Sequence, residues 1–203
     1  NAMVLYTLLL AVPGLFSWLL PQGLMQGLRT FTGWLAAAAG PVALYAMQRI
    51  YRIKARPYWD HWQVATAFYG SMLTLGALTV AVVYAVVLLV QGQPFANLLA
   101  ALAWPMALGL MAEGLGLIVH AHYLGRRGGE AAASHLEQRT TYGKTYLLRN
   151  ISLALSIVVV GALGAVQLDG YAGFLAWILA AALIIVIAII GRALFYVLVI
   201  PTT

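Results

Sequence analysis

Residues 49–62, RIYRIKARPYWDHW, form a basic and aromatic block in a chain that is otherwise apolar. Long apolar runs flank this block on both sides. In a chain that is 64% hydrophobic and only 8% charged, such a block indicates a membrane boundary, where cations lie near lipid headgroups and aromatic rings at the interface. The block therefore decides the fold class, which is a set of membrane-crossing helices joined by short polar loops.

The composition excludes several classes of protein. Soluble domains carry about 25% charged residues, so we interpret this chain of 203 residues as an integral membrane protein. The net charge of +6 comes from residues in short loops, where they set orientation, and we predict no nucleic-acid partner. The chain has no cysteine, which excludes disulfides, iron–sulfur clusters and thiolate metal sites within it.

The apolar runs predict an all-α, polytopic transmembrane helical bundle of about six spans. The predicted spans are residues 4–20, 31–50, 64–90, 98–119, 145–168 and 171–200. A short surface helix is expected at 131–138, and Pro13 and Pro41 predict kinks in the first two spans. No internal repeat or low-complexity linker is evident, so residues 3–203 are interpreted as one domain.

The start of the chain is interpreted separately. Asn1 and Ala2 precede Met3 and are interpreted as the remnant of an expression tag. The first apolar run has no basic residue before it and no small-residue cleavage pattern after it, so it is predicted to be a span and not a cleaved signal peptide.

The cations predict the orientation of the chain. Six spans place both termini and ten of the eleven lysines and arginines on one side, with Arg29 on the other. By the positive-inside rule that side is the cytoplasm, which predicts a multi-pass protein of the inner membrane with cytoplasmic basic loops and termini.

One predicted span contains an acid. Gly109, Glu113, Gly116 and His120 follow one another at steps of four, three and four, so they share one face of a helix. A carboxylate facing lipid costs about 3 kcal/mol, so this face is expected to look into the bundle or a wet cavity. Glu113 is either a proton acceptor with His120 as its partner, or the partner of a cation such as Arg192.

Other polar residues are weighed in the same way. Arg192 and Tyr196 lie four apart on one helix face. Arg192 either binds a lipid phosphate, extends to the headgroups or pairs with Glu113. The four histidines lie on separate elements, except for His120 and His122, which point to different sides of a helix. We therefore predict no metal or haem in this chain.

Two motifs resemble a known family. The first is Arg49-Ile-Tyr51 with Arg56-Pro57-Tyr58-Trp59 between two spans, and the second is the closing Gly191-Arg192-Ala-Leu-Phe195-Tyr196. Together they resemble the membrane anchor of the dimethyl sulfoxide reductase family. The resemblance implies an eight-span bundle of which this chain matches the later six helices, from the third span onward, as a truncated or a naturally short relative. The histidine and acid that the family associates with quinol oxidation lie in its earlier helices and have no counterpart here.

The resemblance implies a non-catalytic anchor that holds a molybdopterin catalytic subunit and an iron–sulfur subunit at the membrane and passes menaquinol electrons to them. The expected quinol-binding residues are Glu113, His120, Arg192 and Tyr196. The expected docking residues are Arg49, Arg52, Arg56, Tyr58 and Trp59, whose other interpretation is a simple topology anchor among membrane lipids. Family members that serve an exported dimer dock it outside, whereas the charges place these loops in the cytoplasm, so both docking sides stay open.

Two other functions are weighed against the anchor. A small secondary transporter or channel would also use a polar face within a span. Transporters often repeat broken helices at matching positions, and Pro13 and Pro41 are expected to have no counterparts in the later spans. An intramembrane enzyme acting on lipid ranks last, because no paired nucleophile and base is evident.

Overall fold

The computed structural model describes residues 21–198, and all regular elements within them are helices. They are α2 (Gln22–Tyr51), α3 (Gln63–Val90), α4 (Ala96–Arg126), α5 (Glu130–Arg139), α6 (Gly143–Val166) and α7 (Gly170–Val197). The all-α prediction is confirmed. The bounds agree with the predicted ranges to within a few residues, except that α2 begins earlier and α4 ends later.

Four of these helices, α3, α4, α6 and α7, are long and apolar enough to cross a membrane. The six-span prediction is therefore supported only in part. The first predicted span, 4–20, lies outside the described residues. The second lies in α2, whose first turns carry polar residues such as Gln26 and Arg29, and α2 does not qualify as an apolar span.

The chain divides into two compact units, residues 1–51 and residues 52–203. In the first unit, α2 runs from Gln22 to Tyr51 as one helix that includes Pro41. The second unit contains α3 to α7 and all of the site described below.

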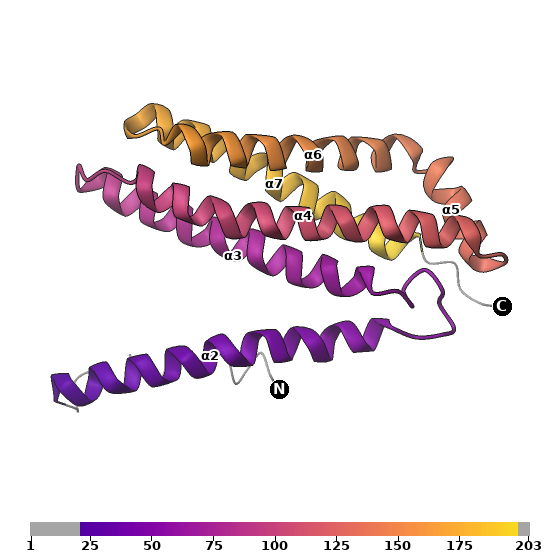
Figure 1. The fold of residues 1–203 in the computed structure, drawn as a ribbon, viewed down its shortest axis with the longest axis horizontal. Coiled ribbons are helices and arrows are strands. Elements are labelled where there is room, and N and C mark those ends of the chain that lie inside the picture. The colour runs from indigo at the N-terminus through magenta and orange to yellow at the C-terminus, as the bar shows by residue number, and fades with distance from the viewer. Residues whose placement is uncertain (1–20, 199–203) are drawn as a thin grey trace. The chain divides into compact units, whose positions relative to one another are not determined.

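The second unit is a four-helix bundle with one short helix at its end (Figure 1). Contacts between α3 and α4, α4 and α6, α6 and α7, and α7 and α3 close a ring of four helices. Its core is aliphatic and aromatic and includes Leu99, Met106, Val160 and Trp177. The outer faces are apolar as well, which is the pattern of helices that lie in lipid. The short helix α5 packs against α4 and α6.

The closest approach in the bundle lies between α3 and α4. A Cβ atom added to Gly70 would lie 2.6 Å from the carbonyl oxygen of Gly109, and a Cβ on Gly109 would collide with the Gly70 backbone. The Thr74 hydroxyl donates a hydrogen bond to the Met106 carbonyl across the same contact, at 3.3 Å. Small residues permit this approach.

The polar face predicted on the fourth span points inward. Gly109, Glu113, Gly116 and His120 are all buried, and the prediction that this face looks into the bundle is confirmed. Gly116 lies against Thr66 of α3, and Gly109 lies against Gly70 and Thr74 of the same helix, so α3 covers both glycines.

The two ends of the bundle differ in charge. Of the eleven lysines and arginines, Arg29 and Arg49 lie in the first unit. The other nine lie toward the end formed by the start of α3, the end of α4, α5, the start of α6 and the end of α7. At the opposite end, Asp169 accepts hydrogen bonds from the backbone N–H groups of Phe95 and Ala96, at 2.9 and 3.1 Å. Asp169 thus caps the N-terminus of α4 from the α6–α7 turn.

One sequence-based expectation is wrong. Pro105 lies inside α4, so the later helices do contain a proline comparable to Pro41. The helix continues through it for several turns. The placement of prolines therefore does not argue against a transporter.

Candidate functional site

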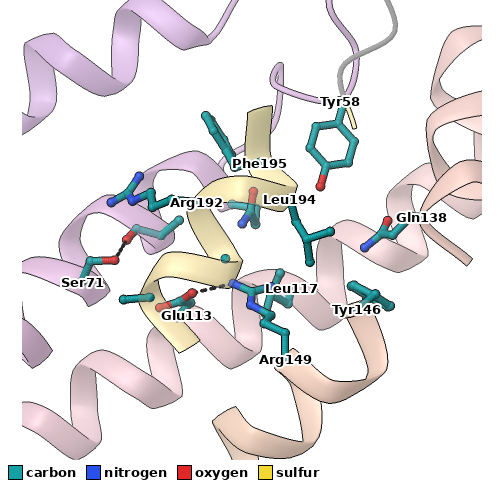
Figure 2. A pocket seen from close by; sticks show the side chains of 14 residues that line it. Tyr58, Ser71, Glu113, Leu117, Gln138, Tyr146, Arg149, Arg192, Leu194 and Phe195 are labelled. Atoms are coloured by element: carbon teal, nitrogen blue, oxygen red, sulfur yellow. Dashed lines mark hydrogen bonds and ion pairs between the residues drawn. The ribbon is translucent and has the colours of Figure 1, made fainter. Parts of the chain in front are cut away.

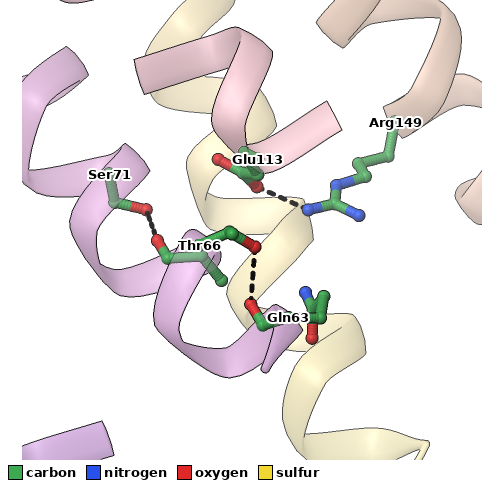
Figure 3. Close-up of polar contacts among 6 residues, drawn as sticks. Gln63, Thr66, Ser71, Glu113 and Arg149 are labelled. Carbon is green, nitrogen blue, oxygen red and sulfur yellow. Dashed lines mark hydrogen bonds and ion pairs between the residues drawn. The ribbon is translucent and has the colours of Figure 1, made fainter. Parts of the chain in front are cut away.

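A buried ion pair lies at the centre of the candidate site (Figures 2 and 3). Arg149 Nη2 on α6 lies 2.5 Å from Glu113 Oε1 on α4, and the two side chains are 6% and 11% exposed. The cation that sequence analysis named for Glu113 was Arg192, and the structure corrects it to Arg149, because α4 and α6 are direct neighbours. A buried pair is stable only when further hydrogen bonds satisfy its remaining polar atoms.

Gly191 of the closing motif makes room for this pair. A Cβ atom on Gly191 would lie 3.2 Å from Arg149 Nη2 and 3.4 Å from Arg149 Nε. These distances are tighter than ordinary van der Waals contact, so the guanidinium lies directly against the bare backbone of α7. The glycine in the motif therefore has a packing role at the ion pair.

Arg192 points to a different partner. Its guanidinium lies over the ring of Phe68 on α3, 4.4 Å from the ring centroid. This is cation–π geometry. Arg192 therefore joins α7 to α3, while Arg149 joins α6 to α4.

The ion pair borders a small polar cavity of about 20 Å³ (Figure 2). Side chains from the 52–62 loop and from all five helices of the unit line it, and they include Tyr58, Glu113, Gln138, Tyr146, Arg149 and Arg192. Figure 3 shows Gln63, Thr66 and Ser71 of α3 on one side of the pair. The cavity thus places one carboxylate, two guanidinium groups and two phenol hydroxyls together, with room for about one water molecule.

The two motifs that carry the family resemblance are in direct contact. Trp59 Nε1–H donates a hydrogen bond to the Phe195 carbonyl at 3.0 Å, across 136 residues of sequence. The two rings stack with centroids 5.5 Å apart, and the Tyr196 ring meets Trp59 edge-on at 6.4 Å. The Arg56 guanidinium covers the Trp59 ring, 5.2 Å from its centroid. The basic loop is therefore fastened to the end of α7.

His120 holds the same loop from inside the bundle. Its Nε2–H donates to the Tyr58 carbonyl at 2.9 Å, and its ring meets the Tyr58 ring at 4.9 Å. A carbonyl oxygen only accepts, so this bond assigns the proton to Nε2. The predicted quinol residues are thus divided: Glu113 and Arg192 share the cavity, His120 lies behind Tyr58, and Tyr196 is exposed at the end of α7.

Tyr58 faces the cavity with its hydroxyl and is 8% exposed. Burial raises the pKa of its phenol well above the ordinary value, and the nearby Arg149 opposes this only in part. Tyr58 is therefore a neutral hydrogen-bonding group of the site.

His61 has a role that sequence analysis missed. Its Nδ1 accepts the backbone N–H of Gln63 at 3.1 Å and so caps the N-terminus of α3. Its ring lies 5.1 Å from that of His120 and 4.6 Å from that of Tyr123. Burial lowers the pKa of His61, the Arg52 charge lowers it further, and Asp60 opposes both. A polar residue just before the first apolar turn was the signal available in the sequence.

The predicted docking residues differ in exposure. Arg52 is exposed, as is the neighbouring Lys54, whereas Arg56 and Trp59 are half-buried and Tyr58 is buried. Arg49 is exposed in the last turn of α2, in the first unit. The cations are therefore accessible, and the rings beneath them hold the loop in place.

Comparisons with protein-family models, with curated proteins and with solved structures gave no match to this chain. Within residues 21–198, no group of three or more His, Asp or Glu side chains is arranged to hold a metal ion.

Proposed function

We propose that this chain is the membrane anchor of a molybdoenzyme complex similar to dimethyl sulfoxide reductase. It tethers an iron–sulfur subunit and a molybdopterin catalytic subunit to the membrane, and it supports menaquinol oxidation and electron transfer to them without being catalytic itself. The contact between Trp59 and Phe195 carries the proposal. It joins the two motifs of the family resemblance into one surface.

That surface suits an acidic partner. Arg52 and Lys54 are exposed on a loop that Trp59 and Tyr58 fasten to the bundle, so the charges lie on an ordered support. Ordered charges of one sign steer the approach of a complementary surface and fix its orientation. We therefore assign docking to the cations and loop support to the two rings.

The placement in the membrane follows from the same charges. Nine cations gather toward one end of the bundle, and Asp169 lies at the other. In this proposal the basic end faces the cytoplasm and the anionic lipids of the inner membrane. A partner that binds the loop would then dock from the cytoplasm.

Menaquinol does not fit inside the cavity, because a two-ring head group is far larger than a space of about 20 Å³. In this proposal the quinol binds outside the cavity, beside Arg192 and Tyr196 at the end of α7. Glu113 and His120 support that region from within, through Arg149 and through the Tyr58 loop.

Co-expression with the two partner subunits tests tethering. The double variant Arg52→Glu, Lys54→Glu should release the catalytic dimer from membranes, because both charges would repel an acidic surface. Arg29→Glu, an exposed cation of the first unit, is the matched control and should leave tethering intact. Tethering that survives the double variant, or a gene without molybdopterin and iron–sulfur neighbours, would contradict the proposal.

Quinol oxidation is tested in the intact complex. Glu113→Gln should slow menaquinol-dependent reduction and leave the activity with an artificial donor unchanged. Equal losses in both assays would show that Glu113 only supports the fold.

A small transporter or channel is the second candidate, and one observation favours it. A charged pair beside a polar cavity, in a helix that contains Pro105, is also found where transporters bind ions. Ion flux through proteoliposomes that contain this chain alone would support that function, because an anchor gives none.

A further inference from the structure

Among the buried polar atoms that lack a hydrogen-bond partner in the described residues, two belong to side chains that line the cavity. They are Arg149 Nε and Gln138 Oε1. The two residues are 5% and 3% exposed, and both line the cavity (Figure 2). An unsatisfied buried polar group costs about 1–3 kcal/mol, and buried polar groups in folded proteins nearly always have a partner, often an ordered water.

The cavity has the size and the lining of a water site. A water molecule needs about 10–15 Å³ of accessible space and two to four polar partners, and this cavity offers about 20 Å³. Of the side chains that line it, Arg149 has a donor in Nε–H and Gln138 an acceptor in Oε1, both without a partner in the described residues. The Glu113 carboxylate and the neutral Tyr58 hydroxyl complete the set.

We propose that this cavity binds water, which accepts a hydrogen bond from Arg149 Nε–H and donates one to Gln138 Oε1. The water links the Glu113–Arg149 pair on α4 and α6 to Gln138 on α5. The inference goes beyond the proposed function, because it holds whether or not the chain oxidises quinol.

Helix α5 gains a role from this assignment. Ala131, Ser134 and Gln138 form its buried face, and among them only Gln138 reaches the cavity. The other charged or titratable groups that face Glu113 across the cavity are Arg149 and Tyr146 from α6, Arg192 from α7 and Tyr58 from the loop. The side chains from α3 and α5 are neutral. Gln138 is thus a positioning residue for the water at the ion pair.

The test uses the full chain in lipid nanodiscs with ¹⁵N-labelled arginine. The signal of Arg149 Nε–H is assigned by its disappearance in Arg149→Lys, and magnetisation transfer from water to this proton is measured. We expect a water cross-peak in the wild type and its loss in Gln138→Leu, which replaces the acceptor by an apolar group. Ser134→Ala, a change at a buried α5 residue outside the cavity, should keep the cross-peak.

Two outcomes overturn the inference. One is a wild-type chain without a water cross-peak, which is decisive even if Gln138→Leu does not fold. The other is a cross-peak that keeps its intensity in folded Gln138→Leu. A clear cross-peak in a complex with no menaquinol-dependent activity would refute the proposed function and leave the water site standing.

Discussion

A carboxylate buried among apolar helices needs a cation nearby. The cation that pairs with Glu113 is Arg149, which lies 36 residues further along the chain. The spacing of the small residues around Glu113 predicted that its helix face is buried. The partner was not predictable from spacing, because Arg149 and Arg192 both lie toward the basic end of the bundle. The choice depends on which helices are neighbours, and that order is a property of the folded bundle.

Removing one member of this pair should be costly. We expect Arg149→Met to lower the free energy of unfolding by about 3–5 kcal/mol, because Glu113 keeps a buried charge without a partner. The double variant Glu113→Leu, Arg149→Met should recover most of that loss. Denaturant unfolding in one fixed detergent measures both. A double variant as unstable as the single one would show that packing, and not the unpaired charge, causes the loss.

The cap that His61 provides should make stability depend on pH. The pKa of His61 in the fold lies below its ordinary value of about 6.5, so its contribution is present above about pH 6.5. It is lost as the pH falls toward the lower folded pKa, because protonated Nδ1 no longer accepts the Gln63 N–H. His61→Asn keeps an acceptor that does not titrate. On acidification, the Tm of the wild type should fall more than the Tm of His61→Asn. If the difference between the two Tm values stays constant with pH, protonation of His61 does not control the stability of this cap.

At the scale of elements, the contact between α3 and α4 depends on glycine. We expect Gly109→Ala to destabilise the bundle by about 1–3 kcal/mol, because its methyl group would press on the Gly70 and Thr74 backbones. Gly114→Ala on the same helix is the matched control, since its methyl group meets only Leu153 Cδ2 at 3.7 Å. Thermal unfolding compares the two variants. Equal effects would mean that helix propensity, and not the contact, is being measured.

The far end of the bundle carries a second testable contact. Asp169→Ala removes the acceptor for the Phe95 and Ala96 N–H groups, so it should cost about 1 kcal/mol, as other N-cap losses do. Hydrogen exchange of these two amides should also quicken. Unchanged exchange would show that the cap contributes nothing to this end of α4.

Long apolar runs predicted the helices well, because few other structures satisfy the backbone within lipid. Four of the six runs correspond to helices that are apolar enough to span, while the run 4–20 lies outside the described residues. A run such as 31–50 extends into a helix whose earlier turns carry Arg29 and glutamines. The cap by His61 was missed although the sequence carried a local signal for it. The cap by Asp169 was not predictable, because it joins the ends of helices that lie more than 70 residues apart. Local sequence patterns therefore predicted the helices. Contacts between residues far apart in the sequence, such as Glu113 with Arg149 and Asp169 with Phe95, became known only from the structure.

For the whole molecule, the division of charge predicts opposite labelling of the two ends. The chain has no cysteine of its own, so the labelling of a single introduced cysteine comes from that position alone. With a membrane-impermeant thiol reagent, Leu136→Cys on α5 should react only in inside-out vesicles. Gln93→Cys in the α3–α4 link should react only in right-side-out ones, because the basic end is expected in the cytoplasm. Reaction of both on the same side would refute the bundle topology in the membrane, and reversed labelling would refute the orientation.

The close contact between the Arg149 guanidinium and Gly191 affects the rotation of α7 about its own axis in the bundle. If α7 turned about its axis by one residue, Ile190 or Arg192 would bring a full side chain against the guanidinium, where a Cβ atom alone would already lie 3.2 Å from Arg149 Nη2. The contact therefore favours the observed rotational setting of the last helix. The same setting presents Phe195 to the loop, so a larger residue at position 191 would disturb both the ion pair and the contact with Trp59.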